Sequence, residues 1–147
     1  MVAVRVFNAH PRRRINTAGI IRAVRRVAAA ERRNALAVTV VFIDDPRTIR
    51  MNREYLRHRG STDVISFTLE EGPPLDGEVY VNLDRAREQA AFYGIAEQEE
   101  ITRLVVHGTL HLLGYDDRTP ALRRRMKTRE DRHVGRLAPP QRGTRRV

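Results

Sequence analysis

The chain has 147 residues, a length that predicts a single domain. It contains no cysteine, which excludes disulfides and thiolate metal sites, so any metal ion must be held by histidine or carboxylate side chains. The formal net charge is +10, and nearly all of the excess is arginine, which points to nucleic acid or another polyanion as a partner. A general use of arginine as a solubilising residue is the alternative explanation.

The apolar stretches are too short to cross a membrane, and the N-terminus lacks the pattern of a signal peptide. We therefore expect a cytoplasmic protein. The first predicted elements are a strand over residues 2–7, a helix that begins at Asn16 or Thr17, and a buried strand over Leu36–Ile43. A short helix is then predicted from the sequence DDPRT to about Leu56.

The second half of the chain predicts two adjacent strands and then helices. The strands cover residues 62–69 and 78–83 around a turn region, and the helices cover residues 84–93, from near 97 to 114, and from 119–120 onward. This order predicts an α+β fold with a mixed sheet that has at least one antiparallel pair. We expect one domain over residues 1–137 and a disordered, Arg- and Pro-rich tail over residues 138–147.

The stretch VVHGTLHLLGYDD carries the clearest chemical signal. His107 and His111 are four residues apart, so both imidazoles project from one face of the predicted helix. A pair of core histidines bonded to the backbone is the alternative, but this helix is apolar nearly all round, and two buried rings need partners. Gly114 then lets the chain turn back, which places Asp117 as a third ligand in the pattern H-x-x-x-H-x-x-G-x-x-D.

This spacing matches the zinc motif of metzincin proteases, H-E-x-x-H-x-x-G-x-x-H, with aspartate as the third ligand. Three protein ligands leave a fourth position open for water, as in a catalytic zinc site. Gly108 occupies the position at which those proteases have their glutamate general base, and glycine cannot accept a proton. The sequence therefore argues against peptide hydrolysis and favours a Lewis-acid centre for phosphodiester chemistry, with the general base unidentified.

Four segments together resemble the YbeY family of bacterial rRNA-maturation endoribonucleases. They are NREYL (52–56), TDVISF (62–67), DGEVYVN (76–82) and HGTLHLLGYD (107–116), in family order between about residues 36 and 118. The resemblance implies a zincin-like fold with a mixed four-stranded sheet and about five helices, and one bound zinc ion. It also implies hydrolysis of single-stranded RNA in 16S rRNA 3′-end maturation and ribosome quality control, with the ribosome or ribosomal proteins as partners.

The chain departs from this family at its third ligand. Most members have histidine where this chain has Asp117, so the ligand role is carried over to an aspartate. Asp116 is the alternative ligand, or it could orient one of the histidines. The spacing from Gly114 favours Asp117.

A second departure affects the candidate RNA-binding residues. Many members have arginine directly after the tyrosine of NREYL, where this chain has Leu56. Arg57 or Arg59 could take over the contact with phosphate, and solvated loop arginines are the alternative. His58, between them, could also approach RNA.

Four other polar residues are given structural interpretations. His10 and His133 are expected on the surface. Ser66, within an apolar strand, is expected to bond to a neighbouring backbone group, and Glu78 to be a charge at a strand edge. A role at the cleft is the alternative for both residues.

Two other function classes remain open from the sequence. A metalloprotease is favoured by the ligand spacing but opposed by Gly108. A ribosome-associated factor with a structural or vestigial metal site is favoured by the arginine-rich segment from Arg123 onward. A solvated helix face followed by a loose tail would explain that segment equally well.

Overall fold

The computed structural model describes residues 1–134, and it has an α+β fold. Within these residues a four-stranded mixed sheet packs with five α-helices, as the sequence predicted. No helix in the described part of the chain is long and apolar enough to cross a membrane. The elements are β1 (Val2–Asn8), α1 (Thr17–Ala30), β2 (Leu36–Ile43), α2 (Asp45–Met51), the π-helical turn η1 (Asn52–Leu56), β3 (Val64–Glu70), β4 (Leu75–Asn82), α3 (Leu83–Tyr93), α4 (Glu97–Leu112) and α5 (Pro120–Val134).

The strands lie in the order β1-β2-β4-β3. β1, β2 and β4 run parallel, and β3 runs antiparallel to β4 at one edge. The antiparallel pair is the one expected from two strands joined by a short turn, because a parallel pair needs a longer crossover. β3 is therefore an edge strand, and it contacts α4 along this edge of the sheet.

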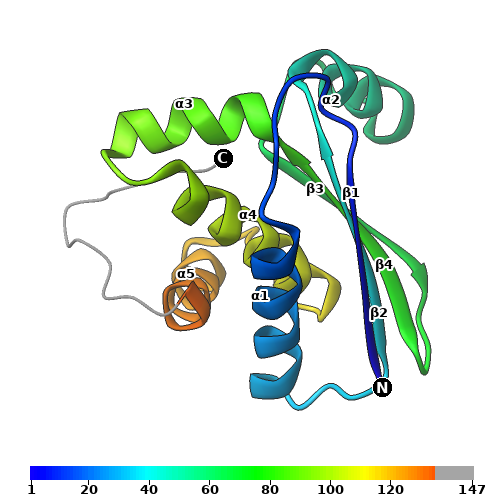
Figure 1. Cartoon of the computed structure of the whole chain (residues 1–147). Helices are drawn as coiled ribbons and strands as arrows, with labels where there is room; N and C mark the ends of the chain where they lie inside the picture. The colour runs from blue at the N-terminus through cyan, green and yellow to red at the C-terminus, as the bar shows by residue number, and fades with distance from the viewer. Residues whose placement is uncertain (135–147) are drawn as a thin grey trace.

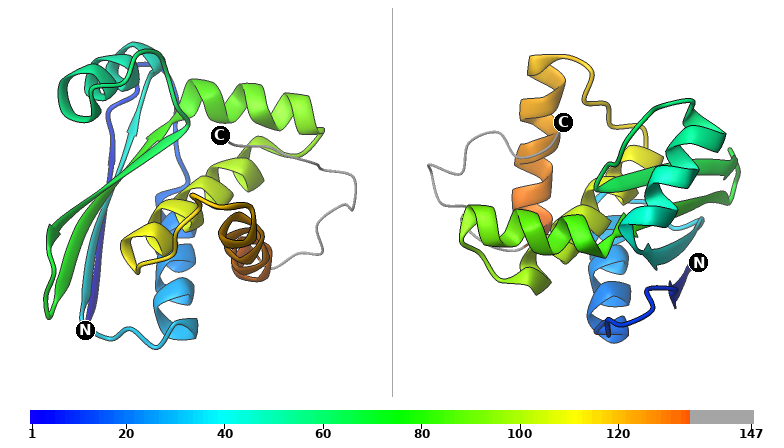
Figure 2. Two further views of the ribbon diagram at one scale, coloured as in Figure 1. Left: turned by 180° about the vertical axis from the view of Figure 1, so that it is seen from behind. Right: turned by 90° about the horizontal axis from the view of Figure 1, so that it is seen from above.

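One face of the sheet is covered by α1 and α4. Figure 1 shows α1, α4 and α5 on the same side of the sheet, and the view from behind in Figure 2 agrees. Alternate residues of β2 and β4 point into this interface, where Val40, Val79 and Leu104 are fully buried. Eleven of the 16 residues of α4 are buried, so this helix packs closely against the rest of the core.

Two element boundaries differ from the sequence-based prediction. β4 begins at Leu75 rather than Glu78, because it pairs with β2 from Leu36 onward and so covers residues predicted to form the turn. The helix predicted to reach Leu56 is α-helical only to Met51 and then widens into η1. The turn ends where Arg57 takes a left-handed conformation, with φ of 55°.

The prediction that His10 and His133 lie on the surface was wrong. The two residues are 7% and 5% exposed. The Nε2 atom of His10 lies 2.9 Å from Asp84, and that of His133 lies 2.9 Å from Glu31. Both carboxylates come from elements distant in sequence, so no local pattern around either histidine signalled its burial. The boundary at 137 and the tail over residues 138–147 lie outside the described residues and stay predictions.

Candidate metal centre

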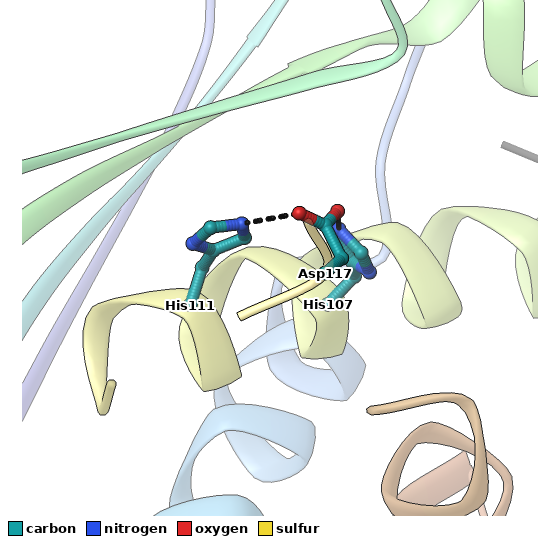
Figure 3. Close-up of side chains that lie close together, drawn as sticks. All are labelled: His107, His111 and Asp117. Carbon is teal, nitrogen blue, oxygen red and sulfur yellow. Dashed lines mark ion pairs between the residues drawn. The ribbon is translucent and has the colours of Figure 1, made fainter. Parts of the chain in front are cut away.

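The three predicted ligand residues lie together at the C-terminal end of α4 (Figure 3). Nε2 of His107 is 3.7 Å from one carboxylate oxygen of Asp117, and Nε2 of His111 is 3.5 Å from the other. One donor atom from each residue lies within 4.8 Å of the other two. Ligand atoms that bind one tetrahedral zinc ion at about 2.0–2.2 Å stand about 3.4 Å apart, so the spacing and the nitrogen and oxygen donors fit such an ion.

The local sequence explains how the carboxylate reaches the histidines. α4 ends at Leu112, and Gly114 adopts a φ of 104°, which reverses the chain at the predicted hinge. Asp116 accepts hydrogen bonds from the backbone and side chain of Arg118, and the backbone bond is the main cause that lowers the pKa of Asp116. Asp117 is the aspartate whose carboxylate faces both imidazoles. The suggested orienting role of Asp116 stays a prediction.

The cluster lies in a cleft that is open on one side. His107 is 9% exposed, whereas the side chain of His111 is 41% exposed. The cleft is also lined by residues of η1, of the following loop and of β3: Asn52, Leu56, His58, Arg59, Ser61, Thr62, Asp63, Val64, Ile65 and Ser66. A ligand held by the three residues would therefore have one side facing this cleft and solvent.

Hydrogen bonds from two asparagines hold the loop that forms the other wall of the cleft. Asn52 donates to the carbonyl of Gly60, and Asn82 donates to the carbonyl of Thr62. Of the two arginines predicted to bind RNA, Arg59 lines the cleft, while the exposed Arg57 is outside the set of lining residues. The loop is thus positioned by buried side chains, although its own residues are mostly exposed.

A buried charged network behind His107 was missed from the sequence. Nδ1 of His107 hydrogen bonds to a carboxylate oxygen of Glu130 on α5, and Glu130 is 2% exposed. The fully buried Arg103 lies 3.6 Å from the other oxygen of Glu130 and 2.6 Å from Asp131. The available signal was the spacing of Glu130 four residues after Met126, which puts an acidic side chain on the buried stripe of α5.

Gly108 lies where α4 packs tightly against the sheet. A Cβ atom at this position would lie 2.4 Å from Cγ1 of Val79 and 3.1 Å from Oγ of Ser66. The Ser66 hydroxyl donates to the carbonyl of Gly108 over 3.1 Å, as expected for a serine with a neighbouring backbone partner. A glutamate general base would not fit here without movement of β4, which gives a steric reason against the protease mechanism in addition to the chemical one.

Glu78 has a partner on its own strand. It accepts a hydrogen bond from the Tyr80 hydroxyl over 3.0 Å, and burial followed by this bond raises the pKa of Tyr80 to about 12. Glu78 therefore interacts within β4, and because β4 lies between β2 and β3, the expectation of a charge at a strand edge was wrong.

Comparison with known proteins identifies the family of this chain. The family described as Endoribonuclease YbeY matches residues 6–138. The chain belongs to the YbeY family. The Endoribonuclease YbeY of Chlorobium luteolum is 40% identical over 126 residues, which cover 86% of this chain and 92% of the relative. The Salinibacter ruber YbeY is 36% identical and covers 88% of each chain, and that of Chlorobaculum parvum is 34% identical and covers 91% of this chain and 94% of the relative.

A solved structure supports the fold. The solution structure of TM1509 from Thermotoga maritima matches with a TM-score of 0.61 at 18% identity, covering 94% of this chain and 99% of the other. At this identity the match bears on the arrangement of strands and helices alone.

Proposed function

We propose that this protein is a zinc-dependent endoribonuclease that cleaves single-stranded RNA, acting in the cytoplasm in 16S rRNA 3′-end maturation and ribosome quality control. Membership of the YbeY family and relatives named Endoribonuclease YbeY support the nuclease activity. The observation that carries the metal dependence is the grouping of His107, His111 and Asp117 in the cleft beside β3. Ribosomal RNA and ribosomal proteins are the partners that this role requires.

The three residues would hold one zinc ion through the Nε2 atoms of His107 and His111 and a carboxylate oxygen of Asp117. Imidazole nitrogen and carboxylate oxygen are both ligands that zinc accepts, and this chain has no thiolate to compete with them. A bound zinc ion supplies Lewis-acid catalysis at a phosphodiester. The anionic Asp117 reduces the net positive charge of such a centre compared with a third histidine.

Glu130 orients the first of these ligands. Its carboxylate accepts the hydrogen bond from Nδ1 of His107, which fixes the tautomer with its lone pair on Nε2, the atom directed toward Asp117. Arg103 lies between Glu130 and Asp131 and offsets their charge in the protein interior. A carboxylate without such a cation would be costly to bury.

The wall of the cleft opposite α4 would bind the phosphates that flank the cleaved bond. Arg59 and His58 line this wall, and Arg57 precedes them in the same loop. A guanidinium matches two phosphate oxygens at once and can offset the charge that develops in the transition state. We propose that Arg59 makes the main contact with these phosphates and that Arg57 contacts a phosphate farther from the cleft.

Metal analysis together with an RNA-cleavage assay tests this function. We expect about one zinc ion per chain in the wild type, cleavage of a single-stranded RNA, little cleavage of the same sequence in a duplex, and no cleavage of casein. His111→Ala should lose both metal and RNA cleavage, because two ligands hold zinc poorly. Asp117→Ala should lose most of the metal, and Asp116→Ala is the matched control that should keep it.

Three results would each contradict a part of the proposal. A metal-free His111→Ala protein that still cleaves RNA would remove the metal from the mechanism. Full metal retention in Asp117→Ala would move the third ligand to another residue. A precursor 16S rRNA with an extended 3′ end, cleaved no better than an unrelated single strand, would count against the role in rRNA maturation.

A further inference from the structure

The positive charge of this protein is concentrated on two helices. Residues 17–33 and 118–134, which contain α1, α5 and their flanking turns, hold 12 of the 28 Lys and Arg residues and only three of the 18 Asp and Glu residues. Their formal net charge is therefore +9, whereas the rest of the described chain, residues 1–16 and 34–117, has a formal net charge of −3. Arginine used as a general solubilising residue would be spread more evenly.

The three acidic residues of these segments all face inward. Glu31 accepts hydrogen bonds from Tyr115 and His133, Glu130 bonds to His107, and Asp131 pairs with Arg103. The segments also carry ten exposed arginines, and we call the surface that these arginines form the basic face. No acidic side chain of the two segments is exposed to offset them. The exposed charge that these two segments contribute is therefore entirely positive, and Arg118 is the arginine among the ten that pairs with an acidic residue, Asp116.

α1 and α5 form one continuous surface. Arg26 on α1 donates to the backbone carbonyl of His133 on α5 over 3.2 Å, and Arg22 and Arg26 line a hollow together with Val134. At the other end of α1, Glu31 lies 3.7 Å from Arg129 of α5. Figure 2 shows both helices on the helical side of the molecule, with the C-terminal end of α5 near α1.

The basic face starts at the edge of the cleft. α5 begins at Pro120, three residues after Asp117, and Arg123 donates to the backbone carbonyl of Asp117 over 3.2 Å. The exposed Arg118 lies in the connecting turn. A polyanion that has one segment in the cleft can therefore continue past Arg118 onto α5 and then onto α1.

The chemistry of the basic face indicates what it binds. Guanidinium groups form paired hydrogen bonds with phosphates. The exposed large aromatic residues in the described part of the chain are Phe7, Tyr55 and Phe92, and none of them belongs to the basic face. Without exposed aromatic rings for base stacking, binding at this surface depends on phosphates and not on base identity.

We propose that the basic face binds the phosphate backbone of the RNA that flanks the segment in the cleft. The inference deepens the proposed function, on which it rests for the identity of the polyanion as RNA. Substrate selection then has two parts. The cleft takes a single-stranded segment, and the basic face favours RNA that continues beyond it, as a structured ribosomal precursor does.

Binding measurements on metal-depleted protein test the proposal without any contribution from cleavage. The probes are an RNA hairpin with a single-stranded extension and the extension alone, each titrated over a range of KCl concentrations after treatment with EDTA. The face variant is the triple substitution Arg22→Gln/Arg25→Gln/Arg132→Gln. The control variant, Arg5→Gln/Arg12→Gln/Arg50→Gln, removes the same charge from exposed arginines elsewhere.

We expect the wild type to bind the hairpin more tightly than the extension alone. The face variant should bind the hairpin at least about 10-fold more weakly than the wild type. The slope of log Kd against the logarithm of the KCl concentration should be smaller by about 2, because binding releases fewer counterions. The control should stay within about threefold of the wild type. Loaded with zinc, the face variant should cleave a short single-stranded RNA at the wild-type rate.

An equal loss in the face and control variants would overturn the proposal, because only net charge would then matter. Unchanged hairpin affinity in the face variant would also overturn it and would leave the surface to another anionic partner, such as an acidic protein. The proposed nuclease function fails separately. If the wild type cleaves no RNA but the face variant still loses hairpin affinity, the basic face stands and the catalytic proposal falls.

Discussion

At the scale of single residues, the candidate metal centre contacts a side chain that belongs to another helix. His107 and His111 follow from the period of α4, but Nδ1 of His107 bonds to Glu130 of α5. Glu130 in turn lies next to the fully buried Arg103. The geometry of the proposed site therefore depends on the packing of α5 against α4. A change in that packing would change the orientation of the His107 ring.

Glu130→Gln should weaken zinc binding about 10- to 100-fold while the fold survives. The glutamine carbonyl can still accept from Nδ1, but it lacks the charge that raises the basicity of His107. Competition with a chromophoric chelator measures the affinity, and nitrogen chemical shifts of the His107 ring report its tautomer. Glu88→Gln, on the exposed face of α3, is the control. Equal zinc affinity in the two variants would remove the orienting role of Glu130.

Gly108→Ala should lower the free energy of unfolding by about 1–3 kcal/mol, although alanine is the better helix former. The added Cβ would lie 2.4 Å from Cγ1 of the fully buried Val79. In a Val79→Ala background that neighbour is absent, so the cost of Gly108→Ala should shrink. Urea denaturation of the four proteins in this cycle gives the coupling energy. If the losses in unfolding free energy from Gly108→Ala and Val79→Ala simply add in the double variant, the contact with Val79 is not the cause of the destabilisation by Gly108→Ala.

At the scale of elements, Glu31 joins three parts of the helical layer. It stands just after α1 and accepts hydrogen bonds from Tyr115, which follows α4, and from His133 on α5. Burial raises the pKa of Glu31, but these hydrogen bonds and the charge of Arg129 outweigh it, so that the pKa is lowered from 4.5. A carboxyl group with a lowered pKa stabilises the folded state in its ionised form.

Glu31→Gln should lower the free energy of unfolding by about 1.5–3 kcal/mol at pH 7, the range for hydrogen bonds to a charged group. The stabilisation by Glu31 is complete above its unfolded-state pKa near 4.5 and is lost as the pH falls through the lower folded-state value. The difference between wild type and variant should therefore narrow below pH 4.5. Denaturation at pH 7 and near pH 3.5 checks this, and a constant difference would contradict it.

At the scale of the whole molecule, the proposed metal site links the core helix α4 to the turn that leads into α5. An ion held by His107, His111 and Asp117 would bind the folded chain and not the unfolded one. Binding of this kind stabilises the fold by mass action. The basic face includes α5, which also holds Glu130 against His107, so the proposed metal site and the proposed RNA-binding surface share one helix.

Zinc at about 100 times its Kd should raise the free energy of unfolding by about 2.7 kcal/mol. For a chain of this size, that corresponds to a rise in Tm of about 5–10 °C. EDTA should reverse the rise. The His111→Ala variant should show no comparable shift, and differential scanning calorimetry measures both proteins. A similar rise in the variant would mean that zinc binds elsewhere in the chain.

The sequence alone determined the features that arise from local periodicity. The spacing of His107 and His111, the turn at Gly114 and the position of Asp117 fall within eleven residues. Helix geometry predicts that the two histidines share a face, and the turn at Gly114 predicts that an aspartate returns to them. The alternation of strands and helices likewise predicted the α+β class and the antiparallel pair. The motifs also identified the family that the comparison then confirmed.

Only the tertiary structure decided which distant residues serve that local motif. Glu130 lies 23 residues after His107, and the buried positions of His10 and His133 depend on carboxylates 74 and 102 residues away. The start of β4 was set by its pairing with β2. The contacts between α1 and α5 decided that the two basic segments form one surface. These features depend on contacts between elements far apart in sequence, and the period of one helix or strand carries no information about its neighbour.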